Sequence, residues 1–120
     1  MQSLIVDLRI VPKVIYPSCC QWTLLILKEI SIKTLYELHI FSDRDLPDEI
    51  MELLPKFKYI SSLGISTPYN SYKNYKDAFY PDIKSLTVSC MSNQTEITNL
   101  QKFIETHAKK IQKLILLDCG

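Results

Sequence analysis

One six-residue motif recurs five times along this 120-residue chain: an aliphatic residue, two variable residues, leucine, one variable residue and a second aliphatic. The copies are Ile5–Ile10, Leu35–Ile40, Ile60–Ile65, Ile83–Val88 and Ile111–Leu116. The final aliphatics of successive copies lie 30, 25, 23 and 28 positions apart. A motif that returns at nearly regular spacing predicts a repeat architecture.

Each copy of this leucine motif predicts a short β-strand. Side chains alternate along a strand, so leucine and the final aliphatic point to one face and the residue between them to the other. Such a strand cannot bury its apolar face alone. Parallel stacking on the next copy, with a helix or irregular segment returning along the outside, builds a continuous core. The predicted fold is therefore α/β, with strands side by side in chain order.

Three segments between the motifs predict helices. In Asp45–Leu54, Pro47 suits the first turn and the following acidic residues complement the helix dipole. In Thr95–Lys110, four apolar residues keep the spacing of one helix face, and His107 falls late on the polar face. Gln21–Ile30 predicts a helix with apolar residues on both faces.

The segment from Pro68 to Pro81 is rich in tyrosine and lysine. Interleaved aromatic and basic residues can stack on single-stranded nucleic acid. Here only two lysines are present, and Tyr72, Tyr75 and Phe79 share helical spacing, so we expect a helical turn at 71–79 whose aromatics cover the core.

The chain resembles the leucine-rich-repeat proteins, and in particular the irregular, cysteine-type repeats of F-box substrate receptors. The motifs carry the resemblance, together with the sequence from Ile111 to Gly120, where Cys119 stands at the family's Asn or Cys position. The resemblance implies a short arc with parallel strands on the concave side and helices or irregular segments on the convex side. Residues 1–120 would form a single domain of about four repeats plus a terminal strand, a fragment of a longer array.

The resemblance also implies a function: a protein–protein recognition module, the substrate-binding repeat region of an F-box-type ubiquitin ligase adaptor. The partner would be a protein, and a Skp-type linker would bind through another region. Leu46–Leu54 itself looks like the opening of an F-box, but the motif's downstream positions do not follow. We therefore favour an ordinary outer helix there.

The predicted docking surface is the concave face. It would display the residues beside each central leucine and the residue after the final aliphatic. Small polar side chains in the middle repeats would let a partner backbone approach, and Phe41 could act as an apolar anchor. The predicted partner-binding residues are Glu37, His39, Phe41, Ser62, Ser66, Ser85, Thr87, Ser89 and Lys113.

Other functional classes have little support in the sequence. Two glycines, Gly64 and Gly120, are too few for a phosphate-binding loop, and a net charge of +1 predicts neither a nucleic-acid nor a membrane partner. Neither His39 nor His107 stands at zinc-ligand spacing. We predict no enzyme, cofactor or metal. The alternative is a compact α/β regulatory or small enzyme domain with a doubly wound sheet, whose strands are covered on both faces.

Cysteine usage and hydropathy suggest the compartment. Cys19 and Cys20 are adjacent, and Cys90 and Cys119 are far from them in sequence. We interpret all four as reduced thiols. No apolar run reaches the roughly 18 residues of a membrane span. The predicted location is the cytoplasm or nucleus.

Overall fold

The computed structural model describes residues 2–67, 78–89 and 94–117. They form an α/β fold with one five-stranded sheet in which every neighbouring pair of strands is parallel. The strands are β1 (Gln2–Asp7), β2 (Leu35–Phe41), β3 (Ser62–Ser66), β4 (Ser85–Ser89) and β5 (Lys113–Leu117). The helices are α1 (Tyr16–Glu29), α2 (Asp48–Leu53) with the 3₁₀ turn η1 (Leu54–Lys56), and α3 (Gln94–His107).

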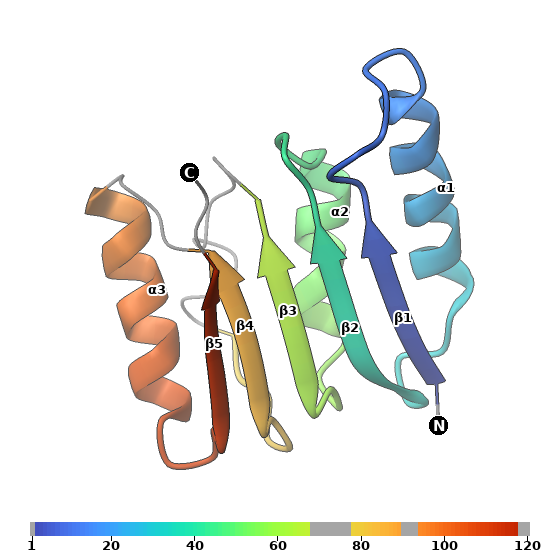
Figure 1. Ribbon diagram of the computed structural model, residues 1–120. Coiled ribbons are helices and arrows are strands. Elements are labelled where there is room, and N and C mark those ends of the chain that lie inside the picture. Colours follow the sequence, from blue (N-terminus) through green and yellow to red (C-terminus); the bar gives the residue numbers. More distant parts are fainter. Residues whose placement is uncertain (1, 68–77, 90–93, 118–120) are drawn as a thin grey trace.

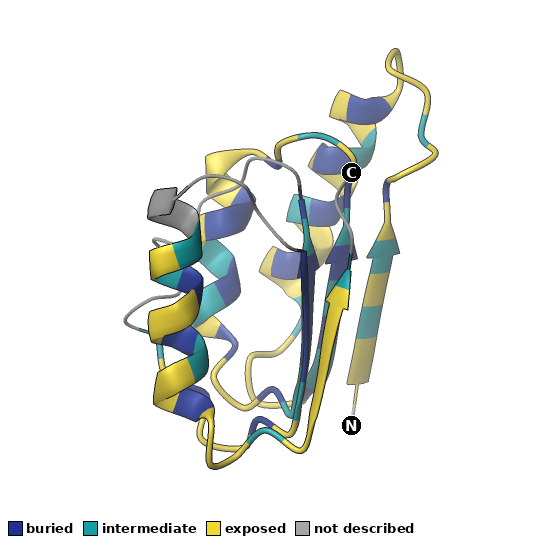
Figure 2. Cartoon of the chain, turned by 60° about the vertical axis from the view of Figure 1, so that its left-hand side comes forward, coloured by how far each residue is buried: buried dark blue, intermediate teal, exposed yellow. Residues whose placement is uncertain are grey.

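The strands lie in the order β1-β2-β3-β4-β5 (Figure 1). Connections between parallel strands are right-handed, so a chain that always moves to the next strand in one direction places all its helices on one face. Figure 2 shows this single helical layer beside the sheet. A doubly wound sheet needs a reversal in strand order. The doubly wound topology is therefore wrong for this chain.

Two rows of apolar side chains cross the sheet on the side of the helices. Parallel pairing brings together the central leucines of the motifs, and the same register aligns the final aliphatics two positions later. The first row is Leu4, Leu38, Leu63, Leu86 and Leu114, and the second is Val6, Ile40, Ile65, Val88 and Leu116. The six members on β2, β3 and β4 are at most 2% exposed, which makes these rows the centre of the core.

The first strand lies earlier than predicted. The row residues of β1 are Leu4 and Val6, whereas the motif beginning at Ile5 would have used Leu8 and Ile10. Leu8 is buried beyond the strand, but Ile10 is 90% exposed. The strand ends at Asp7, whose carboxylate accepts the backbone N–H of Arg9 at 3.0 Å and closes a turn. From Val6 to Ile40 the interval is 34 residues rather than 30.

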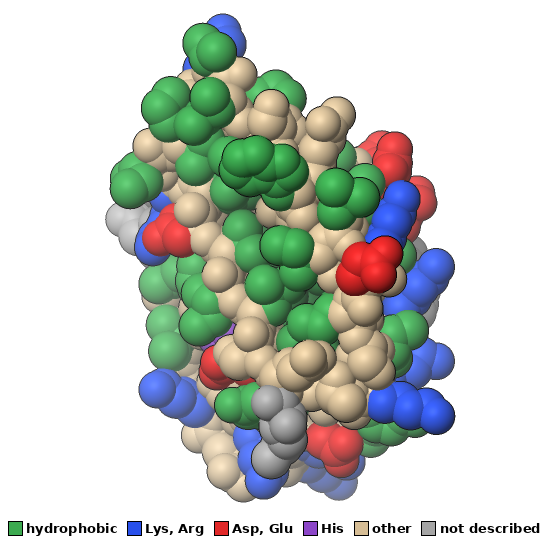
Figure 3. Space-filling view, turned by 90° about the vertical axis from the view of Figure 1, so that its right-hand side faces the viewer, with side chains coloured by type: hydrophobic (Ala, Val, Ile, Leu, Met, Phe, Trp, Pro, Cys, Tyr) green, Lys and Arg blue, Asp and Glu red, His purple; other side chains and the backbone are tan. Residues whose placement is uncertain are grey.

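Helix α1 begins five residues before the predicted start, with Pro17 in its first turn. Its buried residues are Tyr16, Cys20, Thr23 and Leu27. This leaves the apolar side chains Trp22, Leu25 and Ile26 at 65%, 59% and 45% exposure. Figure 3 shows hydrophobic side chains gathered on this end of the molecule. Cys19 and Cys20 are free thiols; Cys90 and Cys119 lie outside the described residues.

Helix α2 confirms that the predicted segment is helical, but the helix begins at Asp48, three residues after the predicted start at Asp45. Pro47 is its N-cap, Asp48 and Glu49 lie in its first turn, and Ile50 is fully buried. Met51 and Leu54 are buried beside it. The apolar side chains of this helix therefore pack into the protein's own core.

Helix α3 confirms the predicted segment but corrects His107. Leu100 and Phe103 are buried as expected, and His107 is 0% exposed rather than on a polar face. Its Nδ1 lies 2.8 Å from the Phe103 carbonyl, and its Nε2 accepts the backbone N–H of Tyr80 at 2.9 Å. This histidine fastens α3 to the segment that leads into β4.

The aromatic residues before β4 are also arranged differently from the prediction. Phe79 is 49% exposed and stacks on the His107 ring, while Tyr80 is the fully buried aromatic. Burial raises the pKa of the Tyr80 hydroxyl well above its usual value. Tyr72, Tyr75 and most of the expected helical turn at 71–79 lie outside the described residues.

The molecule measures 41 × 34 × 20 Å and its radius of gyration is 13.6 Å. A compact domain of this length has a radius of gyration of about 14 Å. Five strands spaced about 4.8 Å apart span only about 19 Å, so a sheet this small is not elongated. In the described part of the chain, no helix combines the length and the apolar character that crossing a bilayer would require.

Candidate functional site: the open face of the sheet

The face of the sheet opposite the helices carries the predicted partner-binding residues. We call it the open face. Strand pairing arranges its side chains in three rows across the sheet. The rows are Ser3, Glu37, Ser62, Ser85 and Lys113; Ile5, His39, Gly64, Thr87 and Ile115; and Asp7, Phe41, Ser66, Ser89 and Leu117. All nine residues proposed from the sequence belong to this face, but Thr87 and Ser89 are buried in it, so a partner could not reach their side chains directly.

Side-chain size varies systematically across the open face. The two middle strands, β3 and β4, carry only glycine, serine and threonine there, whereas β2 and β5 carry larger side chains. Several small residues are also well covered: Thr87 is 5% exposed and Ser89 is 0% exposed. Ser89 Oγ donates to Ser66 Oγ at 2.6 Å, which satisfies polar groups that would otherwise be buried without a partner.

His39 is held in the middle of the face. Its Nε2 lies 2.9 Å from Ser62 Oγ on the next strand and 3.8 Å from a carboxylate oxygen of Glu37. The ring covers Gly64, where an added Cβ would collide with the imidazole. Glycine is therefore needed here for close approach of a side chain. Ser3 Oγ donates to Glu37 at 2.5 Å and extends the network to β1.

The environment of His39 determines its charge. Desolvation by burial lowers the pKa of His39 below its usual value, and the Glu37 carboxylate opposes that shift. The net direction is downward, so the ring is neutral at pH 7 and Nε2 is available as a hydrogen-bond partner for Ser62.

The His39–Ser62 pair lacks the other parts of a nucleophilic site. In a catalytic triad the carboxylate holds the imidazole nitrogen remote from the serine. Here Glu37 is nearest Nε2, the same nitrogen that contacts Ser62, while Nδ1 lies over Gly64. The backbone N–H groups of β2 and β3 are used in the sheet ladder rather than aimed at an oxyanion. The arrangement suits non-covalent recognition better than acyl transfer.

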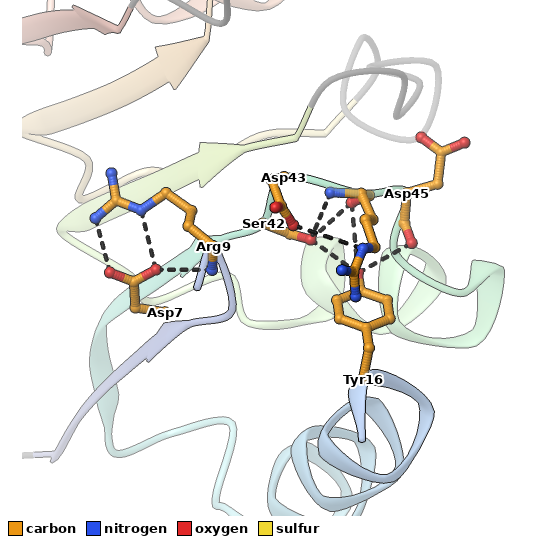
Figure 4. A network of polar contacts seen from close by, with 7 residues as sticks. Asp7, Arg9, Tyr16, Ser42, Asp43 and Asp45 are labelled. Atoms are coloured by element: carbon orange, nitrogen blue, oxygen red, sulfur yellow. Dashed lines mark hydrogen bonds and ion pairs between the residues drawn. The ribbon is translucent and has the colours of Figure 1, made fainter. Parts of the chain in front are cut away.

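Phe41 is less free than the sequence predicted. It is half-buried, and the guanidinium carbon of Arg9 lies 4.9 Å from its ring centroid. Arg9 also donates from Nε and Nη2 to the carboxylate of Asp7, at 2.9 and 2.7 Å (Figure 4). These hydrogen bonds lower the pKa of Asp7 to about 2. A partner would meet a planar ion pair stacked on Phe41 at this corner.

The loop after β2 is fastened to α1 by a second polar network. Ser42 Oγ donates to the Arg44 carbonyl at 2.7 Å, and the Tyr16 hydroxyl lies 2.8 Å from Ser42 Oγ (Figure 4). The Arg44 guanidinium lies over the Tyr16 ring at 4.9 Å. Burial raises the pKa of the Tyr16 hydroxyl to about 12, so it stays a neutral donor. This network holds in place the corner that carries Phe41.

Sequence analysis missed the contribution of β1 to the face. Ser3, Ile5 and Asp7 complete the three rows, and Arg9 packs on Phe41. The available signal was the alternation Ser3-Leu4-Ile5-Val6-Asp7, in which polar or exposed positions flank Leu4 and Val6. That alternation fits a strand four residues before the one that the motif selected.

The described residues contain no cluster of three or more His, Cys, Asp or Glu side chains able to hold a metal ion. Comparison of the chain with known protein families, with curated proteins and with solved structures gave no match. The fold and its open face are therefore the basis for proposing a function.

The pKa of His39 can be tested directly. We expect the ring to titrate below about 6.5, the usual value for histidine, because burial disfavours its charged form. The linked stability is present above that pH and is lost as the pH falls through the folded pKa. Glu37→Gln should lower the pKa further, since it removes the opposing charge. The imidazole proton shifts in NMR report both values, and a midpoint above about 6.5 would contradict the assigned environment.

Proposed function

We propose that this protein is a recognition module of the leucine-rich-repeat type that docks a protein partner on the open face of its sheet. In the fuller form of the proposal, the strands form the concave side of a short arc. The module would read substrates for an F-box-type ubiquitin ligase. Recognition is non-covalent and needs no cofactor.

The observation that carries the proposal is the uncovered face. Strands in unbroken chain order with helices in one layer leave the opposite side of the sheet without a helical cover in the part of the chain that the structure describes. Repeat proteins use extended surfaces of this kind for binding. The motif register supports the repeat assignment, because the central leucines of the four later motifs and Leu4 fall into one continuous row.

The chemistry of the face supports a protein partner. The partly exposed hydroxyl side chains of Ser62, Ser66 and Ser85 offer hydrogen bonds without bulk, so a peptide backbone can come close. Glu37, His39 and Phe41 on β2 supply charge, a neutral imidazole and an aromatic ring. Ile115, at 36% exposure, supplies apolar contact on β5. Aromatic residues combined with surrounding polar groups are typical of interfaces.

The ubiquitin-ligase part of the proposal rests on the resemblance of the repeats. A Skp-type linker would have to bind outside α2, since Ile50, Met51 and Leu54 are committed to the core. The full-length protein, captured from its own cells, should therefore bring down a Skp-type linker. Capture of partners without such a linker would remove the ligase assignment and leave the docking face standing.

The docking face itself is tested by site-specific photo-crosslinking. We expect a photoreactive phenylalanine analogue at Ser62 or Ser85 to crosslink the captured partner, because both positions lie in the first row of the open face. The same analogue at Gln101, exposed on α3, serves as the control on the helical side. Equal crosslinking from Gln101, or crosslinking from that position alone, would contradict docking on the sheet.

A substitution pair measures the same interface. Phe41→Ala should weaken partner binding by about tenfold or more if Phe41 is a central contact. Trp22→Ala is the matched truncation of an exposed aromatic on α1, and it should change the affinity less than about threefold. If Trp22 has the larger effect, the partner docks on the apolar side of α1 rather than on the open face.

A further inference from the structure

Positive charge is concentrated along one edge of the sheet. All strands begin at the lower edge in Figure 1, which we call the amino edge. Residues 26–35, 54–62, 78–85 and 104–113 form the described part of this edge, and they carry eight lysines and three carboxylates. The lysines are Lys28, Lys33, Lys56, Lys58, Lys84, Lys109, Lys110 and Lys113, and the carboxylates are Glu29, Asp82 and Glu105. A net charge of +1 for the whole chain conceals this excess.

The fold explains part of the clustering. Every helix here runs back antiparallel to the strands, so helix C-termini also collect at the amino edge. Lysine in a last helical turn is favoured by the helix dipole, as at Lys28 of α1 and Lys56 of η1. Lys84 follows no helical turn of this kind: it immediately precedes β4. The dipole therefore does not account for the whole cluster.

A pocket of about 420 Å³ opens on this edge between the segments that precede β4 and β5. Its lining includes Lys84, Lys109 and Lys110, with one carboxylate from Asp82 and polar side chains from Ser61 and Gln112. Within the described residues, none of the three lysines forms an ion pair. Lys110 reaches over the exposed face of Phe79, with its Nζ 5.6 Å from the ring centroid. The volume is in the range of small-molecule sites, although the pocket is an open surface depression rather than an enclosed cavity.

We propose that this amino-edge pocket binds a small, multiply charged phosphate compound. Three lysines line one opening, and an anion with several phosphate charges would be attracted by all three. Lysine is well suited to phosphate as a compact point charge with three donors. The remaining lysines along the edge raise the local concentration of anions through the long-range field.

Two features oppose anion binding and define its specificity. Asp82 places a negative charge in the lining, and the C-terminus of α3 points its carbonyl groups toward the same edge. A singly charged anion gains too little attraction from the lysines to offset the repulsion from Asp82 and from the carbonyl groups of α3. The site therefore favours a ligand that carries several charges, and Asp82→Asn should strengthen binding.

The test is a titration of the 120-residue chain with tripolyphosphate, followed by calorimetry and by amide NMR shifts at about 50 mM salt. We expect saturable one-to-one binding, with the largest shifts at Asp82, Lys110 and Gln112. Replacing Lys84, Lys109 and Lys110 together by glutamine should weaken binding at least about tenfold, a loss of about 1.4 kcal/mol, because it removes all three positive charges from the lining.

A charge-matched control separates the pocket from the general field of the edge. The triple variant Lys33→Gln, Lys56→Gln and Lys58→Gln removes the same charge from the same edge outside the pocket. It should weaken binding less than about threefold. The absence of saturable binding, or an equal loss in the two triple variants, overturns the proposal. Circular dichroism checks that both variants fold, which is expected because the substituted side chains are exposed.

Discussion

Leu63→Ala is expected to lower the free energy of unfolding by about 3 kcal/mol, because it removes a buried side chain from the middle of the leucine row. Leu63 is 1% exposed, and the rows of β2 and β4 flank it on both sides. The cavity cannot be filled without moving a strand of the sheet. Urea unfolding followed by circular dichroism measures the change.

Leu114→Ala is the matched control at the end of the same row. Leu114 occupies the same motif position but is 44% exposed on the edge strand β5. Its truncation should cost about 1 kcal/mol or less. If the two substitutions cost the same, the inner face of β5 is covered in solution by something that the described residues do not include.

His107→Ala is expected to destabilise the protein by about 4 kcal/mol, because it leaves both a cavity and unpaired polar groups. A carbonyl cannot donate, so the bond to Phe103 requires a proton on Nδ1, and Nε2 of the neutral ring then accepts from Tyr80. Phe103 and Phe79 pack against the same ring. Chemical denaturation of the variant tests the expected loss.

His107→Phe separates the hydrogen bonds from the packing. It keeps most of the volume but leaves the Tyr80 N–H without its partner, so we expect a loss of about 2 kcal/mol. Thr106→Val removes the exposed bond to the Lys102 carbonyl and should change stability by less than about 0.5 kcal/mol. A His107→Phe variant as stable as the parent would mean that the Tyr80 bond does not form in solution.

Periodicity predicted most of the architecture but placed the first strand incorrectly. The four later motifs are strands whose leucines align, and the predicted helices around Ile50 and Leu100 are present. The N-terminal run allows two strand placements in the same alternation phase, one through Leu4 and Val6 and the other through Leu8 and Ile10. Pairing with β2 and the turn closed by Asp7 chose between them. The alternation from Ser3 to Asp7 was the local signal for the earlier strand, and a search based on the motif alone did not use it.

The burial of individual side chains differs from the prediction where tertiary contacts outweigh helical spacing. His107 was expected on a polar face and is fully buried, because its two ring nitrogens have partners on both sides. Phe79 was expected in the core, but Tyr80 occupies that place. A sequence pattern reports polarity and spacing, whereas burial of a polar ring depends on which backbone groups lie within reach.

The candidate open face was accessible from the sequence to a large extent. All nine proposed residues share it, because side chains alternate along each strand, and every second residue faces away from the core. Their role as a docking surface stays a prediction. The stacking of Arg9 on Phe41 and the position of His39 over Gly64 follow only from the side-by-side placement of distant strands.

The amino-acid sequence by itself determined the alternation of strands and helices and the leucine row that holds them, since both depend on local periodicity and apolar burial. The tertiary structure decided where the charges lie. Eight lysines scattered from position 28 to position 113 meet at one edge because every strand of a parallel sheet starts on the same side. The net charge of the whole chain, +1, hides that uneven distribution.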